Sequence, residues 1–253
     1  MPEAKTYPLT EMALTLQYNE ARPFSPNQAV AIHNAVRKSL PTIDIVGRLN
    51  LGMPDGLVLS EEHPAQRWWF SSQSGERLLQ FQDDAVSANW RHRSQIGEAA
   101  PDPYPGFEEM VRRLGEARSL WMKHTHTEIE PPAHMISVLY DNLWPHEERM
   151  ADTFEFWNHM GISGPQIGPE LKWRIMLTDP ILGSQASINI LAGLGAMSTN
   201  DQLIVKAARL QLSATASPDP SVKVEVALAA LRTAVGDYFR KLLTPSARKS
   251  WDV

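Results

Sequence analysis

The stretch from Arg67 to Arg93 (RWWFSSQSGERLLQFQDDAVSANWRHR) constrains the fold more than any other part of the chain. It begins with an aromatic run that favours a strand, and Ser74-Gly75 then supplies residues typical of a tight turn. Apolar side chains alternate with glutamines (LLQFQ) up to Asp83-Asp84, and the alternation resumes in the opposite phase beyond them (VSANW). Because a slip of one residue would turn a continuous strand inside out, a second turn at Asp83-Asp84 is the economical interpretation. The stretch therefore predicts three short antiparallel strands.

The remaining patterns predict that each half of the chain contains a strand, a helix, a three-stranded antiparallel meander and a second helix. In the first half, the strand and the helices flanking the meander are expected at residues 12–18, 26–40 and 107–121. In the second half, the corresponding elements are expected at residues 135–140, 146–160, 172–178, 187–191, 203–216 and 222–243. The opening strands also resemble each other, with LTLQYN at residues 14–19 and ISVLYDN at residues 136–142.

This order of elements predicts an α+β fold made of two similar halves, residues 1–130 and 131–253, either as two units or as one continuous domain. The helices are expected to pack on one face of the sheet, and the halves to pair edge to edge, which would hide strand edges. The other sheet face would then be polar and free for recognition.

Several polar side chains share that outer face if the alternation holds along each strand. They are Arg67, Gln80, Asn89 and Arg91 in the first half, and Lys172, Arg174, Asn189, Arg209 and Gln211 in the second. Every charged member is positive, although the chain carries a net charge of −5. Arginine with asparagine and glutamine can bind carboxylates, phosphates or base edges, so this set is a candidate binding face. The simpler alternative is an ordinary solvated sheet face, where arginine is common.

Composition narrows the chemistry that the chain can perform. The absence of cysteine excludes disulfides, thiol nucleophiles and cysteine-ligated metal. The acidic balance argues against indiscriminate attraction to nucleic acid, while leaving room for a local basic patch. The N-terminal residues lack the features of a signal peptide, and the longest apolar run is far shorter than a membrane-spanning helix. We therefore expect a cytoplasmic protein without a membrane partner.

A short histidine-rich segment provides one candidate metal site. On an extended strand, His124, His126 and Glu128 would share one face, as zinc ligands require. The alternative is a frayed helix end that leads into Pro131-Pro132 as a solvated linker. No other metal or cofactor is expected.

Two further motifs are incomplete. The sequence His146-Glu147-Glu148 lacks the second histidine of a zinc-protease helix, because Met150 stands in its place. The glycines at positions 193 and 195 resemble a dinucleotide-binding turn without its third glycine, and a loop between strands is expected there instead.

The segments WWFSSQSG, NWR and YPGF carry a resemblance to a sporadically distributed family of bacterial and archaeal proteins of similar length, which has no assigned activity. The family pattern is W-R/K-F-S-S-x-x-G followed by N-W-R and a Tyr-Pro helix start. It continues with a strand containing Leu139-Tyr140-Asp141-Asn142 and ends with Thr-Pro and a late tryptophan, here Thr244-Pro245 and Trp251. Here Trp69 replaces the usual arginine or lysine, and Asp141 stands where small apolar residues are usual.

The sequence favours a non-enzymatic binding protein that holds a protein partner on the paired sheets. The patchy distribution of the family it resembles is typical of accessory genes, so the partner is expected in a defence or toxin–antitoxin system. The first alternative is a nucleic-acid-binding protein that uses the same sheet faces. The second is a metal-dependent enzyme built on the histidine-rich segment.

Overall fold

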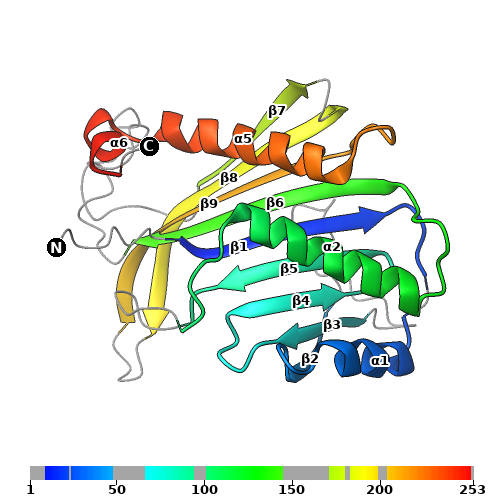
Figure 1. Cartoon of the computed structure of the whole chain (residues 1–253). Helices are drawn as coiled ribbons and strands as arrows, with labels where there is room; N and C mark the ends of the chain where they lie inside the picture. Colours follow the sequence, from blue (N-terminus) through cyan, green and yellow to red (C-terminus); the bar gives the residue numbers. More distant parts are fainter. Residues whose placement is uncertain are drawn as a thin grey trace.

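A computed structural model describes residues 9–22, 24–47, 66–93, 101–144, 171–179, 183–198 and 204–251. These residues form an α+β fold in which helices pack against one large antiparallel sheet (Figure 1). The strands are β1 (Leu9–Tyr18), β2 (Thr42–Gly47), β3 (Gln66–Ser71), β4 (Arg77–Phe81), β5 (Ala85–Arg91), β6 (Ala133–Trp144), β7 (Leu171–Asp179), β8 (Gly183–Ser198) and β9 (Ile204–Ala216). The helices are α1 (Pro26–Val36), α2 (Phe107–His124), α5 (Val224–Leu242) and α6 (Pro245–Trp251).

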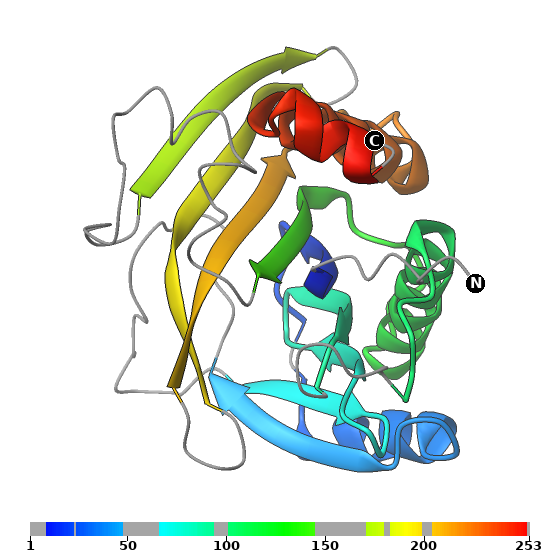
Figure 2. The same cartoon turned by 90° about the vertical axis from the view of Figure 1, so that its left-hand side faces the viewer.

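The described strands form a nine-stranded sheet in the order β2-β3-β4-β5-β1-β6-β9-β8-β7. Strands β1 and β6 pair at its middle, so the sheet runs without interruption from residues of the first half to residues of the second. Helix α2 packs on β1, β4 and β5, and α5 packs on β6 and β9. Both helices lie on the same side of the sheet, as the turned view in Figure 2 shows. The strands also turn progressively across the sheet (Figure 1), as the right-handed twist of strands requires.

The three-stranded meander predicted from the sequence is confirmed as β3, β4 and β5. Gly75 has a φ of 74° in the turn between β3 and β4, a conformation that glycine adopts without steric cost. In the turn between β4 and β5, the Gln82 amide donates to the Asp84 carboxylate at 2.6 Å. The predicted change of phase at this turn therefore marks the end of one strand and the start of the next.

Helix α1 begins at the predicted residue. The Ser25 side chain accepts a hydrogen bond from the Gln28 backbone, and the Gln28 side chain accepts one from the Ser25 backbone at 2.6 Å. This reciprocal cap satisfies two of the N–H groups that a helix start leaves unpaired. Pro26 follows in the first helical turn, where its missing N–H costs nothing.

Helix α2 buries one stripe of side chains against the sheet, and Trp121 is its largest member. The indole of Trp121 stacks on Tyr18 of β1 with 4.6 Å between ring centroids. Its N–H donates to the backbone carbonyl of Gln82 at 3.0 Å, so the one polar atom of this buried ring is satisfied. The contact fixes α2 on both β1 and the turn after β4.

The second half differs from the sequence prediction in one strand. Residues 193–198 were expected in a loop, but they belong to β8 and pair with β9 from Gly193 opposite Arg209 to Ser198 opposite Ile204. The glycines favour a loop locally, but backbone hydrogen bonds to β9 along residues 193–198 outweigh this local preference. The helix predicted at residues 146–160 lies outside the described residues. In the described part of the chain, no helix is long and apolar enough to cross a membrane.

Replacing Trp121 by alanine tests the packing of α2. Trp121 is 0% exposed, so Trp121→Ala should lower the free energy of unfolding by about 3–5 kcal/mol through lost burial and a residual cavity. The matched control is Val30→Ala on α1, because Val30 is 55% exposed and should change stability by only about 0.5 kcal/mol or less. Chemical denaturation monitored by circular dichroism measures both values. A loss below about 1 kcal/mol for Trp121→Ala would contradict the packing described here.

Candidate functional site

A row of polar side chains crosses the sheet on the face opposite α2. Cross-strand register places the following residues in one line over six neighbouring strands: Gln80, Ser87, Thr15, Ser137, Thr215 and Ser187. The Thr15 and Ser87 hydroxyls bond each other at 2.8 Å, as do those of Ser187 and Thr215 at 3.1 Å. These four hydroxyls are bonded in two cross-strand pairs, which link β1 to β5 and β8 to β9 on the polar face.

The amide side chains of this face are buried, so the prediction that they would face solvent is wrong for Gln80 and Asn89. Both residues are 5% exposed. The Gln80 amide nitrogen donates to Asn89 Oδ1 at 2.6 Å, and the Asn89 amide donates to Glu11 Oε1 at 3.1 Å. These bonds offset part of the cost of burying the two amides, because buried polar groups are tolerated when they are hydrogen-bonded, while Gln80 Oε1 is enclosed without a partner among the described residues. The bonds also link β4, β5 and β1 across the face.

Beside this amide chain, two arginines converge on one tryptophan. The guanidinium carbon of Arg67 lies 5.2 Å from the ring centroid of Trp69, and that of Arg91 lies 4.8 Å from the same centroid. Arg67 and Trp69 come from β3, whereas Arg91 comes from β5. All three side chains are half-buried. We call these three residues the arginine–tryptophan cluster.

The two guanidinium groups of the cluster lack an acceptor. Within the described part of the chain, neither the Arg67 side chain nor the Arg91 side chain forms a hydrogen bond or an ion pair, and the Nε atom of each is enclosed without a partner. The indole nitrogen of Trp69 is enclosed without a partner as well. Their terminal guanidinium nitrogens are neither enclosed nor bonded among these residues. Three N–H donors of the cluster are thus without a hydrogen-bond partner among the described residues.

The electrostatics of the cluster reflect this shortage of acceptors. Burial lowers the pKa of Arg67, and the neighbouring charge of Arg91 lowers it further, while Glu11 acts in the opposite direction. Burial also lowers the pKa of Arg91. Glu11 lies directly opposite Arg91 in the β1–β5 register, and burial raises its own pKa despite the hydrogen bond from Asn89. The carboxylate of Asp141, across from Glu11 on β6, adds to this rise.

Of the residues predicted for this face in the first half, the structure brings together Arg67, Gln80, Asn89 and Arg91. The prediction missed Glu11, Trp69 and Asp141. Glu11 could have been found, because it holds the polar phase of the strand in which Met12, Leu14 and Leu16 are buried. Trp69 and Asp141 are the two departures from the family pattern that the sequence resembles. The departure from the family pattern singled out both positions, but it did not indicate that the two side chains share a face of the sheet.

The residues predicted in the second half lie on β7, β8 and β9, which are separated from β3 and β5 by β1 and β6 in the strand order. Arg209 donates to both carboxylate oxygens of Asp141 at 2.7 to 3.1 Å, so its charge is neutralised by a bidentate ion pair. Arg174 pairs in register with Asn189, and Lys172 with Leu191. Gln211 is opposite Asp141 on one side and Leu191 on the other.

The histidine-rich segment is not an extended strand. His124 ends α2, Thr125 caps it, and His126 has a φ of 55°, so the alternation that would align two imidazoles with Glu128 is absent. The alternative of a helix end leading into Pro131-Pro132 describes the backbone. Among the residues that the structure describes, no three His, Asp or Glu side chains are grouped as a metal ion requires.

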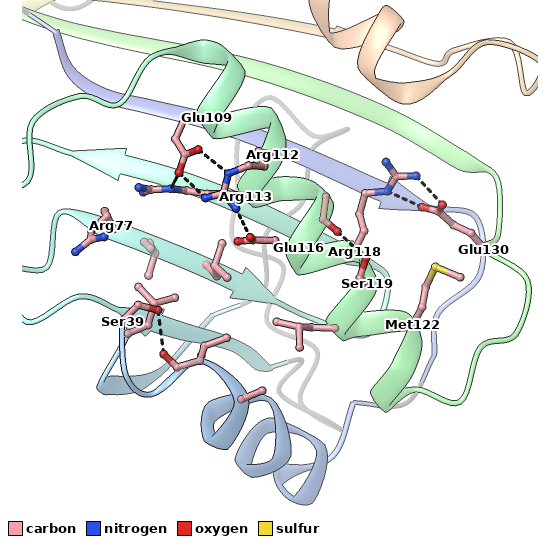
Figure 3. Close-up of a pocket in the computed structure, with 17 residues that line it drawn as sticks. Ser39, Arg77, Glu109, Arg112, Arg113, Glu116, Arg118, Ser119, Met122 and Glu130 are labelled. Atoms are coloured by element: carbon pink, nitrogen blue, oxygen red, sulfur yellow. Dashed lines mark hydrogen bonds and ion pairs between the residues drawn. The ribbon is translucent and has the colours of Figure 1, made fainter.

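A groove of about 1000 Å³ lies between α1 and α2 above β4 (Figure 3). Its charged side chains are paired with one another: Arg113 with Glu109 at 2.9 Å, and Arg118 with Glu130 at 2.6 Å. Arg77 pairs with Asp102 beyond the groove at 2.9 Å. Each of the charged side chains named here is therefore neutralised by a partner, in contrast to the arginines of the arginine–tryptophan cluster. The cluster is therefore the better candidate site.

No protein-family model, curated protein or solved structure matches the chain. What the cluster can bind is therefore inferred from its geometry and charge.

Replacing Glu11 by glutamine tests the electrostatics of the face. Burial raises the pKa of Glu11, so the folded protein is less stable with Glu11 ionised than with Glu11 protonated. Glu11→Gln should therefore raise the unfolding temperature at pH 7. At this pH the wild-type protein must either bury an ionised carboxylate or bind a proton on folding, and glutamine does neither. The difference between the two proteins should shrink as the pH falls and Glu11 becomes protonated in both states.

Thermal unfolding of both proteins from pH 7 to pH 4 measures this difference. Glu20→Gln is the matched control, because Glu20 is exposed and bonded only to Arg22. A fall in unfolding temperature at pH 7 for Glu11→Gln would show that the carboxylate stabilises the fold.

Proposed function

We propose that this protein is a non-enzymatic binding protein that holds a protein partner at the arginine–tryptophan cluster on the polar face of its sheet. The observation that carries the proposal is the pair of half-buried guanidinium groups without an acceptor. Burying a cation is costly unless a counter-charge or hydrogen bonds compensate for the lost water. The contacts with Trp69 offset part of this cost, since a cation over an indole ring contributes about 0.5–1 kcal/mol or more. The acceptor that is missing within the described residues would come from the partner.

The composition of the cluster suits a protein partner. Tryptophan and arginine are the residues that contribute most often to binding hot spots, and here they contact each other. The hydrogen-bonded chain Gln80–Asn89–Glu11 orders these side chains before binding. The entropy cost of ordering them when a partner binds is therefore reduced.

Nucleic acid is the less favoured alternative. A nucleic-acid strand gains affinity from a series of cations along its phosphates. On this face, Glu11 and Asp141 lie beside the cluster, and the next cation, Arg209, is neutralised by Asp141. A single anionic group fits such a surface better than a polyanion does. The metal-dependent alternative has no support among the described residues, because no three His, Asp or Glu side chains are grouped there.

We also propose that the halves are repeats of one βαβββα unit. Apart from β2, which lies beyond β3, the strand order is mirrored about the centre, with β1-β5-β4-β3 on one side and β6-β9-β8-β7 on the other. The echo between residues 14–19 and 136–142 matches Thr15 with Ser137, and these two residues are opposite each other in the β1–β6 register. A two-fold relation through this pair would therefore account for both the sequence echo and the strand order. From the resemblance seen in the sequence, we propose that the partner belongs to a defence or toxin-neutralising system.

Loss of one guanidinium should impair partner capture. The purified protein, immobilised and exposed to an extract of its native host, should retain one or more specific proteins, and Arg91→Gln should retain them at least about tenfold less. Arg37→Gln is the matched control, because Arg37 is an exposed arginine at the end of α1, away from the polar face. Quantitative mass spectrometry of the retained proteins measures the ratio.

Equal retention by the wild type and Arg91→Gln would remove the cluster from the binding surface. Retention of nucleic acid that survives nuclease-free washing and disappears with increasing salt would favour the alternative instead. A circular dichroism spectrum unchanged by Arg91→Gln establishes that the variant is folded.

A further inference from the structure

Building on the proposed binding role, we propose that the group taken from the partner is a single carboxylate, bound by the guanidinium ends of Arg67 and Arg91 beside the Trp69 ring. The carboxylate is supplied by an acidic side chain or by a chain end. This assignment names the chemistry of the site, whereas the binding role alone does not.

The donors present at the site define the shape of the ligand. A guanidinium group offers its N–H bonds in a flat fork that matches the two oxygens of a carboxylate. Because the Nε atoms of Arg67 and Arg91 are enclosed, their terminal nitrogens are the donors that an incoming group can reach. Both guanidinium carbons lie within 5.2 Å of the centroid of one ring, and the charge of Arg91 acts on Arg67. The proposal therefore places the anion between their free ends.

The local charge selects a monoanion. Charge repulsion acts between Arg67 and Arg91 and between Arg91 and Arg93, while Glu11 attracts both arginines of the cluster and Asp44 attracts Arg91. Among these described side chains the cations outnumber the carboxylates by one, so a ligand with a single negative charge is the match. A carboxylate supplies one negative charge, whereas a phosphate monoester near pH 7 supplies about −1.5 to −2 and would be repelled by the two carboxylates.

Glu11 is the internal competitor of this ligand. It lies opposite Arg91 in the sheet, and its charge acts on both arginines of the cluster, but it forms no ion pair within the described residues. Its oxygen instead accepts the hydrogen bond from Asn89 at 3.1 Å, which holds the carboxylate on β1. Asp141 and Arg209 face Glu11 from β6 and β9. Removing the charge of Glu11 leaves the arginines with less internal compensation, so Glu11→Gln should bind an external carboxylate more tightly.

Titration of the full-length protein with small probes tests the assignment. The probes are N-acetylglutamate amide, which carries a side-chain carboxylate, N-acetylglycine, which carries a chain-end carboxylate, N-acetylglutamine amide as the neutral match, and inorganic phosphate. Nitrogen-15 NMR follows the indole N–H signal of Trp69, identified by its absence in Trp69→Phe. The side-chain N–H signals of Arg67 and Arg91 are followed in the same spectra.

At least one carboxylate probe should shift the Trp69 signal in a saturable manner at millimolar concentration, and the neutral match should not. The affinity should fall at least about tenfold in Arg91→Gln and rise in Glu11→Gln. Arg37→Gln should bind as the wild type does. The two carboxylate probes distinguish a side-chain ligand from a chain-end ligand.

Three results would overturn the carboxylate assignment: equal shifts with the neutral match, tighter binding of phosphate than of either carboxylate, or no shift with any probe. If Arg91→Gln loses its partner while no carboxylate probe acts on Trp69, the binding role stands and the carboxylate assignment fails. If a carboxylate binds while Arg91→Gln keeps its partner, the site is real and the proposed role of the cluster in partner binding fails.

Discussion

The pairing of β1 with β6 is the contact on which the rest of the structure depends. It joins the strands of both halves into one sheet and removes the two exposed strand edges that separate halves would leave. It also brings α2 and α5 together on one face, where Arg118 of α2 bonds Glu225 of α5 at 2.7 Å and Arg232 of α5 bonds Glu108 of α2 at 3.1 Å. With the helices on that face, the polar phase of every strand falls on the other.

The polar face combines order with unsatisfied charge. Side-chain hydrogen bonds within its hydroxyl row and the Gln80–Asn89–Glu11 chain link β4, β5 and β1, and β5 carries Arg91. These two guanidinium groups are left without acceptors in the described part of the chain. A fold selected for stability alone would pair or remove such cations, as it does for Arg209 with Asp141. Natural proteins accept such costs mainly where function needs them.

Local patterns made much of this fold predictable. The phase change at Asp83-Asp84 and the cap at Ser25 each depend on a few adjacent residues, and the structure contains both features as expected. The shared face of Arg67 and Arg91 also follows from strand alternation. Strand alternation could not predict that Gln80 is buried, because the exposure of a side chain depends on what packs around the sheet and not on the strand alone. The strand at residues 193–198 required knowledge of its partner β9, and the meeting of Trp69 with Arg91 required the order of strands that are distant in sequence.

The free energy of unfolding of the ligand-free double variant Arg67→Gln/Arg91→Gln tests the central claim most directly. If the two cations are present for binding and not for folding, their removal relieves mutual repulsion and the cost of burial, which offset the lost contacts with Trp69. The variant should then be as stable as the wild type to within about 1 kcal/mol, or more stable. A loss of about 3 kcal/mol or more would show that the two arginines stabilise the fold, which would contradict the claim that they are present for binding.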